Sequence, residues 1–139
     1  MSDQKCHLDQ ARHNERLASS LFREEDFPDW VGTTSFYAAV HYVEAGLSLI
    51  PGVGHSEASL PVDPVTRQSW GTLHNWREEL VRRHFPGAFK SYKYLRTVSN
   101  HARYLKGNNK PAFTYFTQKD SESFIRNHLA GIKGALKVA

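Results

Sequence analysis

One histidine and one carboxylate, His41 and Glu44, stand one helical turn apart among the apolar residues of segment 29–50 (DWVGTTSFYAAVHYVEAGLSLI). Buried polar groups need hydrogen-bond partners, so this pair predicts a polar cluster inside the protein. The side chains expected to take part in it are His13, Asn14, Tyr37, His41, Glu44 and His74.

Three roles are open to such a cluster. It could be a structural hydrogen-bonded network, it could line a pocket for a nucleotide or other ligand, or its imidazoles and carboxylate could bind a metal ion. A metal site needs three or four converging ligands, and the spacing of residues along a chain does not show convergence. We therefore favour the structural role and expect no metal and no cofactor.

The elements that must position these residues are helices. Segment 29–50 is apolar around most of its circumference, which is typical of a helix covered by other helices; Asp29 is expected to cap its start and Pro51-Gly52 to end it. Further helices are predicted over residues 4–22, 65–84, 88–105 and 118–136. We expect an all-α fold: one domain, 1–139, forming a bundle of about five helices with a long loop after the second.

Composition narrows the class of protein. Hydrophobic residues make up 40% and charged residues 23% of the 139, which is ordinary for a soluble domain. The single cysteine excludes an internal disulfide framework. No segment resembles a secretion signal, and polar residues interrupt the most apolar stretch, which argues against membrane insertion. We expect a cytoplasmic protein without a membrane partner.

Charge is distributed unevenly along the chain. Residues 1–63 hold four Lys or Arg against ten Asp or Glu, a net charge of −6, whereas residues 77–110 hold nine against two, a net charge of +7. The basic fourth helix and its surroundings could form a phosphate-binding face, or a solvated face that meets an acidic protein partner or a second copy. The candidate nucleic-acid-binding residues are Arg82, Arg83, Lys90, Lys93, Arg103 and Lys106.

Several short runs resemble the HEPN superfamily. They are Ala11-Arg-His13-Asn14, Asp29-Trp30-x₅-Phe36-Tyr37-Ala38-Ala39-x-His41-x₂-Glu44-Ala45-x-Leu47, and Tyr92-x₂-Leu95-x₃-Ser99-x₂-Ala102-Arg103-Tyr104. The similarity covers about residues 8–105. It implies a small helical bundle, often dimeric, of the kind found in toxin–antitoxin, CRISPR-linked and antiviral systems.

Active HEPN members are metal-independent ribonucleases with an Arg-x₄₋₆-His motif. Arg96-Thr-Val-Ser-Asn-His101 matches it, so the resemblance implies that Arg96 stabilises the phosphate and that His101 moves the proton. Two features depart from the family pattern. Thr97 stands where a polar Asn, Asp or His is common, and the two residues lie about 140° apart on one helix.

The departures favour a binding module over an enzyme. We expect a HEPN-like module, non-catalytic or weakly active, that binds RNA, a nucleotide or a protein partner through its basic fourth helix, in a defence or toxin–antitoxin system and as a homodimer. The alternative is a metal-independent endoribonuclease that uses Arg96 and His101 as catalytic residues.

Overall fold

The computed structural model describes residues 3–61, 72–104 and 109–137, which are helical with no strand. Four long helices are α1 (Asp3–Glu24), α2 (Pro28–Leu47), α4 (Leu73–His84) and α5 (Pro86–Tyr104). A fifth helical segment consists of α6 (Gln118–Ser123), a π-helical stretch (Phe124–Leu129) and α7 (Ala130–Leu136). Two short elements, α3 (Ser56–Ser59) and a 3₁₀ helix (Ala112–Tyr115), complete the set. The predicted all-α bundle of about five helices is confirmed.

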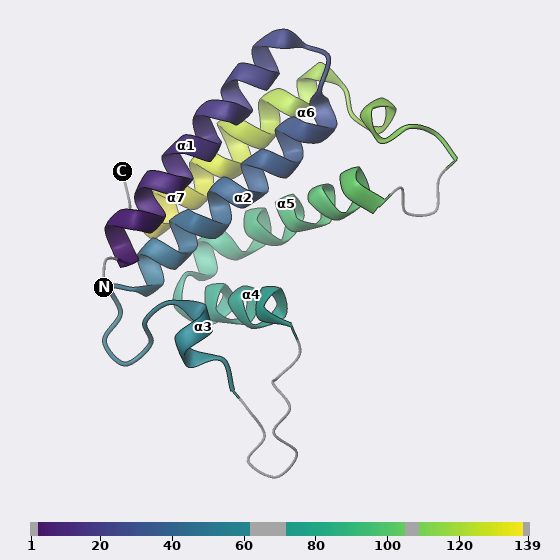
Figure 1. The fold of residues 1–139 in the computed structure, drawn as a ribbon. Helices are drawn as coiled ribbons and strands as arrows, with labels where there is room; N and C mark the ends of the chain where they lie inside the picture. Colours follow the sequence, from purple (N-terminus) through teal and green to yellow (C-terminus); the bar gives the residue numbers. More distant parts are fainter. Residues whose placement is uncertain (1–2, 62–71, 105–108, 138–139) are drawn as a thin grey trace.

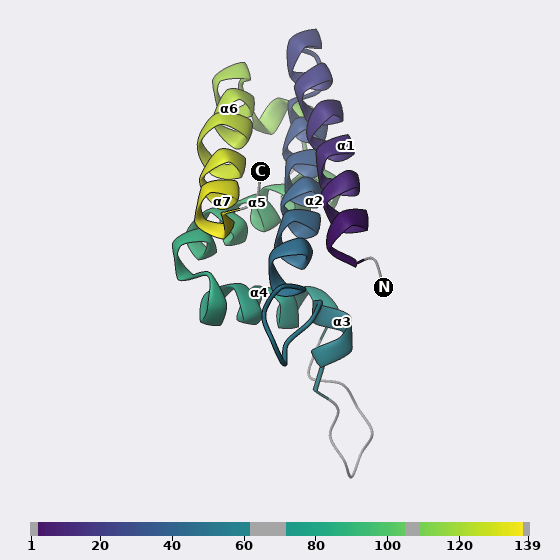
Figure 2. The same cartoon turned by 90° about the vertical axis from the view of Figure 1, so that its left-hand side faces the viewer.

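The helices form a bundle around α2. Helix α1 packs along α2, and the C-terminal segment runs beside them, while α5 crosses this group at an angle and α4 lies at one end (Figures 1 and 2). Helix α2 contacts α1, α5 and the C-terminal segment. It is therefore the helix through which α1, α5 and the C-terminal segment are held together, whereas α4 packs on α5.

Helix α2 is buried because its own apolar and small residues occupy most of its circumference. Phe36, Val43 and Leu47 are among the residues that are completely or almost completely buried, as expected for a helix with no polar face. None of the helices in the described ranges has the length and apolar character needed to cross a membrane.

The start of α2 differs from the prediction. Phe27 occupies the N-cap position without a side-chain capping bond, and Pro28 begins the helix, so Asp29 is not the cap and lies in the first turn. Proline is favoured there because the first helical N–H groups have no partner within the helix. The negative charge of Asp29 still complements the helix dipole.

Other helix ends also differ from the predicted positions. Pro86 and Gly87 lie between the predicted helices 65–84 and 88–105, but in the structure they are the first residues of α5, because proline suits a first turn. Helix α4 begins at Leu73, where the Thr72 hydroxyl accepts a hydrogen bond from the backbone N–H of Asn75 at 3.1 Å. The predicted start of that helix at residue 65 lies outside the described residues.

Gly32 marks the closest approach of three elements. A Cβ atom added there would lie 2.5 Å from Cγ1 of Val98 on α5 and 3.2 Å from Cε2 of Phe124 in the π-helical stretch. Interiors this closely packed do not absorb an extra methyl group without strain. The absence of a side chain at Gly32 is thus a condition of the packing between α2 and α5.

We expect Gly32→Ala to lower the free energy of unfolding by about 1–3 kcal/mol, because α5 must move away from α2. Urea unfolding followed by circular dichroism measures it. Gly131→Ala on α7 is the matched control, since nothing lies within 4 Å of the added Cβ, and alanine favours a helix by up to about 1 kcal/mol. Unchanged or increased stability of Gly32→Ala would contradict the close packing.

Candidate functional site

The carboxylate of Glu44 is buried where α2 meets α3 and α4. Its Oε1 accepts a hydrogen bond from the backbone N–H of Ser56 at 2.9 Å, and its Oε2 accepts one from the Ser56 hydroxyl at 2.8 Å. Nη2 of Arg77 lies 3.5 Å from the same Oε2, and the two charged side chains are 5% and 7% exposed. A buried carboxylate is costly unless it is paired and hydrogen-bonded, so these contacts hold α3 and α4 against α2.

Histidines from α1, α2 and the loop before α3 gather beside Glu44. Nδ1 of His7 and Nδ1 of His41 are 2.9 Å apart, and the two rings stack with centroids 5.2 Å apart. The ring of His55 lies 6.0 Å from that of His7. One nitrogen of the His7–His41 pair must donate and the other accept, so at least one of these rings has to be neutral on that side.

Burial lowers the pKa of His41 below its ordinary value, and the nearby His7 and Arg77 lower it further. Desolvation and neighbouring positive charge both oppose protonation of an imidazole. His41 therefore favours the neutral form at neutral pH, in which one ring nitrogen carries a lone pair. That lone pair can accept a proton or a hydrogen bond.

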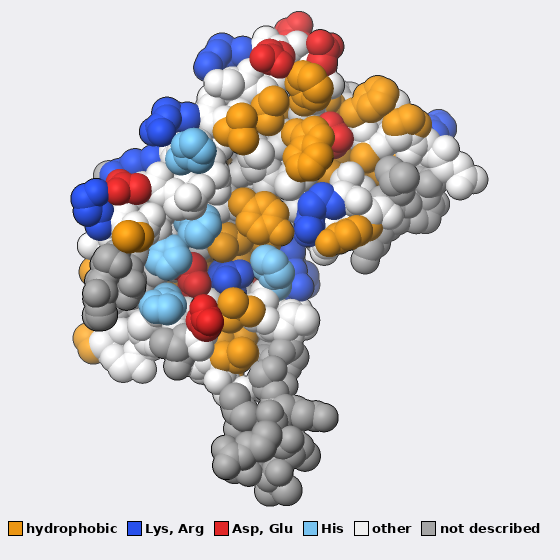
Figure 3. Space-filling view, viewed as in Figure 1, with side chains coloured by type: hydrophobic (Ala, Val, Ile, Leu, Met, Phe, Trp, Pro, Cys, Tyr) orange, Lys and Arg blue, Asp and Glu red, His pale blue; other side chains and the backbone are white. Residues whose placement is uncertain are grey.

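On α4, His74 completes this group. Its Nδ1 lies 3.2 Å from Nη1 of Arg77, which makes it an acceptor. Burial lowers the pKa of His74, and Arg77, Arg96 and Arg103 lower it further. We call the group formed by His7, His41, Glu44, His55, His74 and Arg77 the histidine cluster; Figure 3 shows several histidine side chains close together on one face of the molecule.

Two buried polar atoms beside the histidine cluster have no hydrogen-bond partner among the described residues. They are Nε of Arg77 and the hydroxyl of Tyr92. Burial raises the pKa of Tyr92 to about 12, so the hydroxyl remains a donor at neutral pH. Unsatisfied buried donors cost free energy; the Arg77 guanidinium next to Tyr92 lowers the pKa of this hydroxyl and so opposes part of the effect of burial.

Of the predicted polar cluster, the structure brings Tyr37, His41, Glu44 and His74 to this region: the rings of Tyr37 and His74 meet edge to face at 6.2 Å. The inclusion of His13 was wrong, because His13 is exposed on α1. Asn14 is half-buried and accepts a hydrogen bond from Gln10 on its own helix. Both residues lie beyond the part of α1 that reaches Glu44, which is the turn carrying His7.

The basic residues Lys90, Lys93 and Arg103 spread over about 140° of the circumference of α5. Lys90 and Lys93 are exposed. Arg103 is half-buried: its guanidinium donates to the hydroxyls of Ser99 and Tyr104, at 3.2 and 3.0 Å, and lies over the ring of Tyr37 at 5.7 Å. We call the group formed by Lys90, Lys93, Arg103, Tyr37 and Tyr104 the α5 surface.

Other predicted nucleic-acid contacts are less available. Arg82 and Arg83, at the end of α4, both pair with Glu79. These side-chain bonds lower the pKa of Glu79 to about 2, so at neutral pH its single negative charge offsets one of their two positive charges. Lys106 lies outside the described residues.

Within one chain, the structure does not bring the predicted catalytic residues Arg96 and His101 close together. Nη2 of Arg96 donates to Oδ1 of Asn75 at 2.9 Å, and Nη1 lies 3.3 Å from Oε1 of Glu78, so this side chain is tied to α4. His101 is exposed on α5. The five-residue separation rotates the two side chains by about 140° around the helix, which directs them to different sides.

A second basic region lies on the other side of α1. A groove of about 500 Å³ there is lined by Arg12, Glu15, Arg16, Ser19, Ser20, Arg23, Tyr42 and Lys133. Glu15 accepts hydrogen bonds from the Tyr42 hydroxyl at 2.6 Å and from Nζ of Lys133 at 3.0 Å. The acidic balance of residues 1–63 concealed this groove, because the arginines of α1 share one face whereas the acidic residues are spread over the segment.

Comparisons with family models, with curated proteins and with solved structures found no match for this chain. The HEPN resemblance therefore stays a prediction.

We expect the free energy of unfolding to fall between about pH 7.5 and about pH 5.5. The pKa of His74 is below its ordinary 6.5 in the folded protein. As the pH drops through 6.5, the unfolded chain binds this proton more readily than the folded one, and stability is lost. Urea unfolding at several pH values measures the loss. His74→Gln should reduce it, whereas substitution of the exposed His84 should not; equal slopes for the two variants would contradict the assignment.

Removing only the charge of Glu44 should be costly. We expect Glu44→Gln to lower the free energy of unfolding by about 3 kcal/mol, because Arg77 remains buried without its counter-charge. The double variant Glu44→Gln/Arg77→Met should recover part of the loss, since it removes both charges. Glu57→Gln on the exposed side of α3 is the control, and a loss no larger than that of the control would exclude a structural role for the ion pair.

Proposed function

We propose that the protein is a binding module for RNA or a nucleotide, and that it binds through the α5 surface. The observation that supports this most directly is that Lys90, Lys93 and Arg103 have no carboxylate partner among the described residues, whereas Arg82, Arg83 and Arg96 do. Positive charge that the protein does not neutralise itself is available to phosphate groups.

The aromatic residues of the α5 surface add a second feature that suits nucleic acid, because bases can stack on them. Tyr104 is 58% exposed, and the Arg103 guanidinium lies 4.7 Å from the centre of its ring. Unpaired bases stack on aromatic rings and on guanidinium planes. Lys90 and Arg103 are separated by roughly 20 Å along the helix axis and by about 140° around it, so a single strand that contacts both would wind around α5.

The geometry supports binding over cleavage. Cleavage by the predicted pair needs Arg96 and His101 at one phosphate, but Arg96 is held by Asn75 and Glu78 while His101 projects from another side of α5. A protein partner with an acidic face is the other occupant that this surface would suit. The homodimer and the place in a defence or toxin–antitoxin system stay predictions of the resemblance, and the cytoplasmic location stays a prediction of the composition.

The test is binding of a short, fluorescently labelled single-stranded RNA of mixed sequence, followed by anisotropy with EDTA present. We expect the triple variant Lys90→Ala/Lys93→Ala/Arg103→Ala to bind at least tenfold more weakly. Its affinity should also depend less on salt, with a slope of log K against log salt smaller by about 2, because three phosphate contacts are lost.

The charge-matched control is Lys5→Ala/Lys119→Ala/Lys137→Ala, which removes three exposed cations located elsewhere. An equal loss in the control would mean that only net charge matters and would overturn the proposal. A loss confined to Arg12→Ala/Arg16→Ala would move the site to the groove beside α1. Cleavage of the RNA that disappears in His101→Ala would favour the ribonuclease instead.

A further inference from the structure

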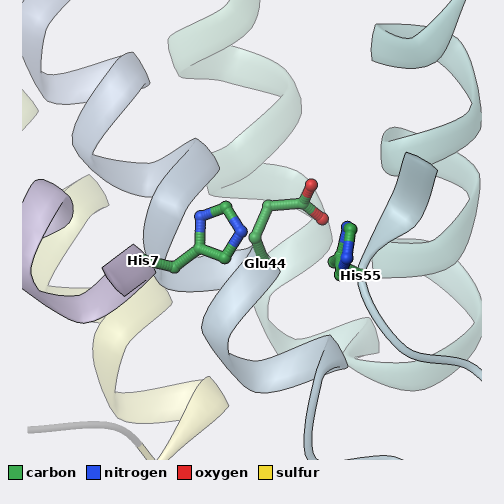
Figure 4. Close-up of side chains that lie close together, drawn as sticks. All are labelled: His7, Glu44 and His55. Atoms are coloured by element: carbon green, nitrogen blue, oxygen red, sulfur yellow. The ribbon is translucent and has the colours of Figure 1, made fainter. Parts of the chain in front are cut away.

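Three side chains of the histidine cluster converge from separate elements. His7 comes from α1, Glu44 from α2, and His55 from the loop that precedes α3 (Figure 4). One ligand atom from each of the three lies within 4.8 Å of the others. Residues 7, 44 and 55 are far apart in sequence, so the bundle and its loop create this grouping.

The donor set is two imidazoles and one carboxylate. These are ligands that Zn²⁺ and similar divalent transition metals bind, and two histidines with one glutamate form a known type of zinc site. Ligand atoms around a tetrahedral zinc ion are about 3.4 Å apart, given bonds of about 2.1 Å. His7 and His55 are half-buried, and binding would require their rings to turn until the ligand atoms are that close.

Neighbouring groups already hold two of the three ligands, His7 and Glu44. Nδ1 of His7 contacts His41 at 2.9 Å, so Nε2 would be the nitrogen of His7 that binds the metal, and His41 would orient the ring. Metal-binding histidines are ordinarily held in this way through their second nitrogen. Ser56 holds both oxygens of the Glu44 carboxylate.

One oxygen of the Glu44 carboxylate also retains a lone pair for an added ion. Oε2 is engaged by the Ser56 hydroxyl and by Arg77, whereas Oε1 accepts only the backbone N–H of Ser56. A carboxylate oxygen has two lone-pair sites, so Oε1 retains one for a metal. Arg77 weakens the attraction for a cation, which makes strong nitrogen donors such as histidine necessary and disfavours Mg²⁺, which prefers oxygen ligands.

We propose that His7, Glu44 and His55 bind a divalent transition-metal ion, with Zn²⁺ as the ion to test. Three protein ligands leave a fourth position for water or a substrate, as in catalytic rather than structural zinc sites. The partial exposure of the two histidines keeps that position accessible. This inference is independent of RNA binding, because the RNA assay is carried out in EDTA.

The experiment is a Zn²⁺ titration of the full chain after EDTA treatment and dialysis, with a chromophoric zinc indicator as competitor. We expect one equivalent to bind, Mg²⁺ not to compete, and the melting temperature to rise on Zn²⁺ addition, because the ion binds the folded state. His55→Ala and His7→Ala should each weaken binding at least tenfold, and the double variant should lose the stoichiometric site.

His13→Ala is the matched control, since it removes an exposed histidine from the same helix as His7, and it should bind Zn²⁺ like the unsubstituted protein. His55 makes no side-chain capping bond to α3, so His55→Ala is the variant expected to keep the fold, which circular dichroism checks. Absence of stoichiometric binding, or equal weakening by His13→Ala and His55→Ala, would overturn the proposal.

Discussion

The buried carboxylate of Glu44 is the interaction on which the arrangement of the site depends. It carries a charge into a helix that is otherwise apolar, and burial of that charge is tolerated only because Ser56 and Arg77 satisfy it. Those two partners bring α3 and α4 to the end of α2. His55 and His74 come with them, because each lies within three residues of one partner. A single buried carboxylate therefore joins α2, α3 and α4 in this region.

The arginines around this region decide which protonation states are available. Arg77 lowers the pKa of both His41 and His74, and Arg96 and Arg103 add to the effect on His74. The imidazoles are kept neutral by positive charge as well as by burial, and they retain lone pairs that water-exposed histidines lose in mild acid. The same guanidinium of Arg103 that acts on His74 belongs to the α5 surface. The two regions are thus neighbours that share an electrostatic environment.

Much of the fold could be predicted because it follows from local patterns. The all-round apolar character of 29–50 indicated a central helix, and helical spacing located the other long helices. Helix ends were harder to predict: Pro28 and Pro86 begin helices, and a proline can either start or stop one.

In the site, His41 and Glu44 were found because they stand one turn apart, and the i, i+3 spacing of His74 and Arg77 would have indicated their contact. No spacing relates His7 or His55 to Glu44, since a helix crossing and a loop bring them together. His13 was placed inside wrongly, because the sequence of an amphipathic helix does not show which of its turns meets a given turn of its neighbour.

The π-helical stretch within the last helical segment affects how this sequence would align with those of distant relatives. A π turn holds one residue more than the α-helical turn it replaces, and residues 130–136 are rotated by about 100° relative to an uninterrupted helix. Leu129, Ile132 and Leu136 reach the interior in that rotated phase. A related protein without the wide turn would keep the same interior only if it lacked one residue between positions 124 and 129. An alignment that forbids a gap there would pair interior positions with exterior ones over the rest of the helix, and distant relatives would look more different than their structures are.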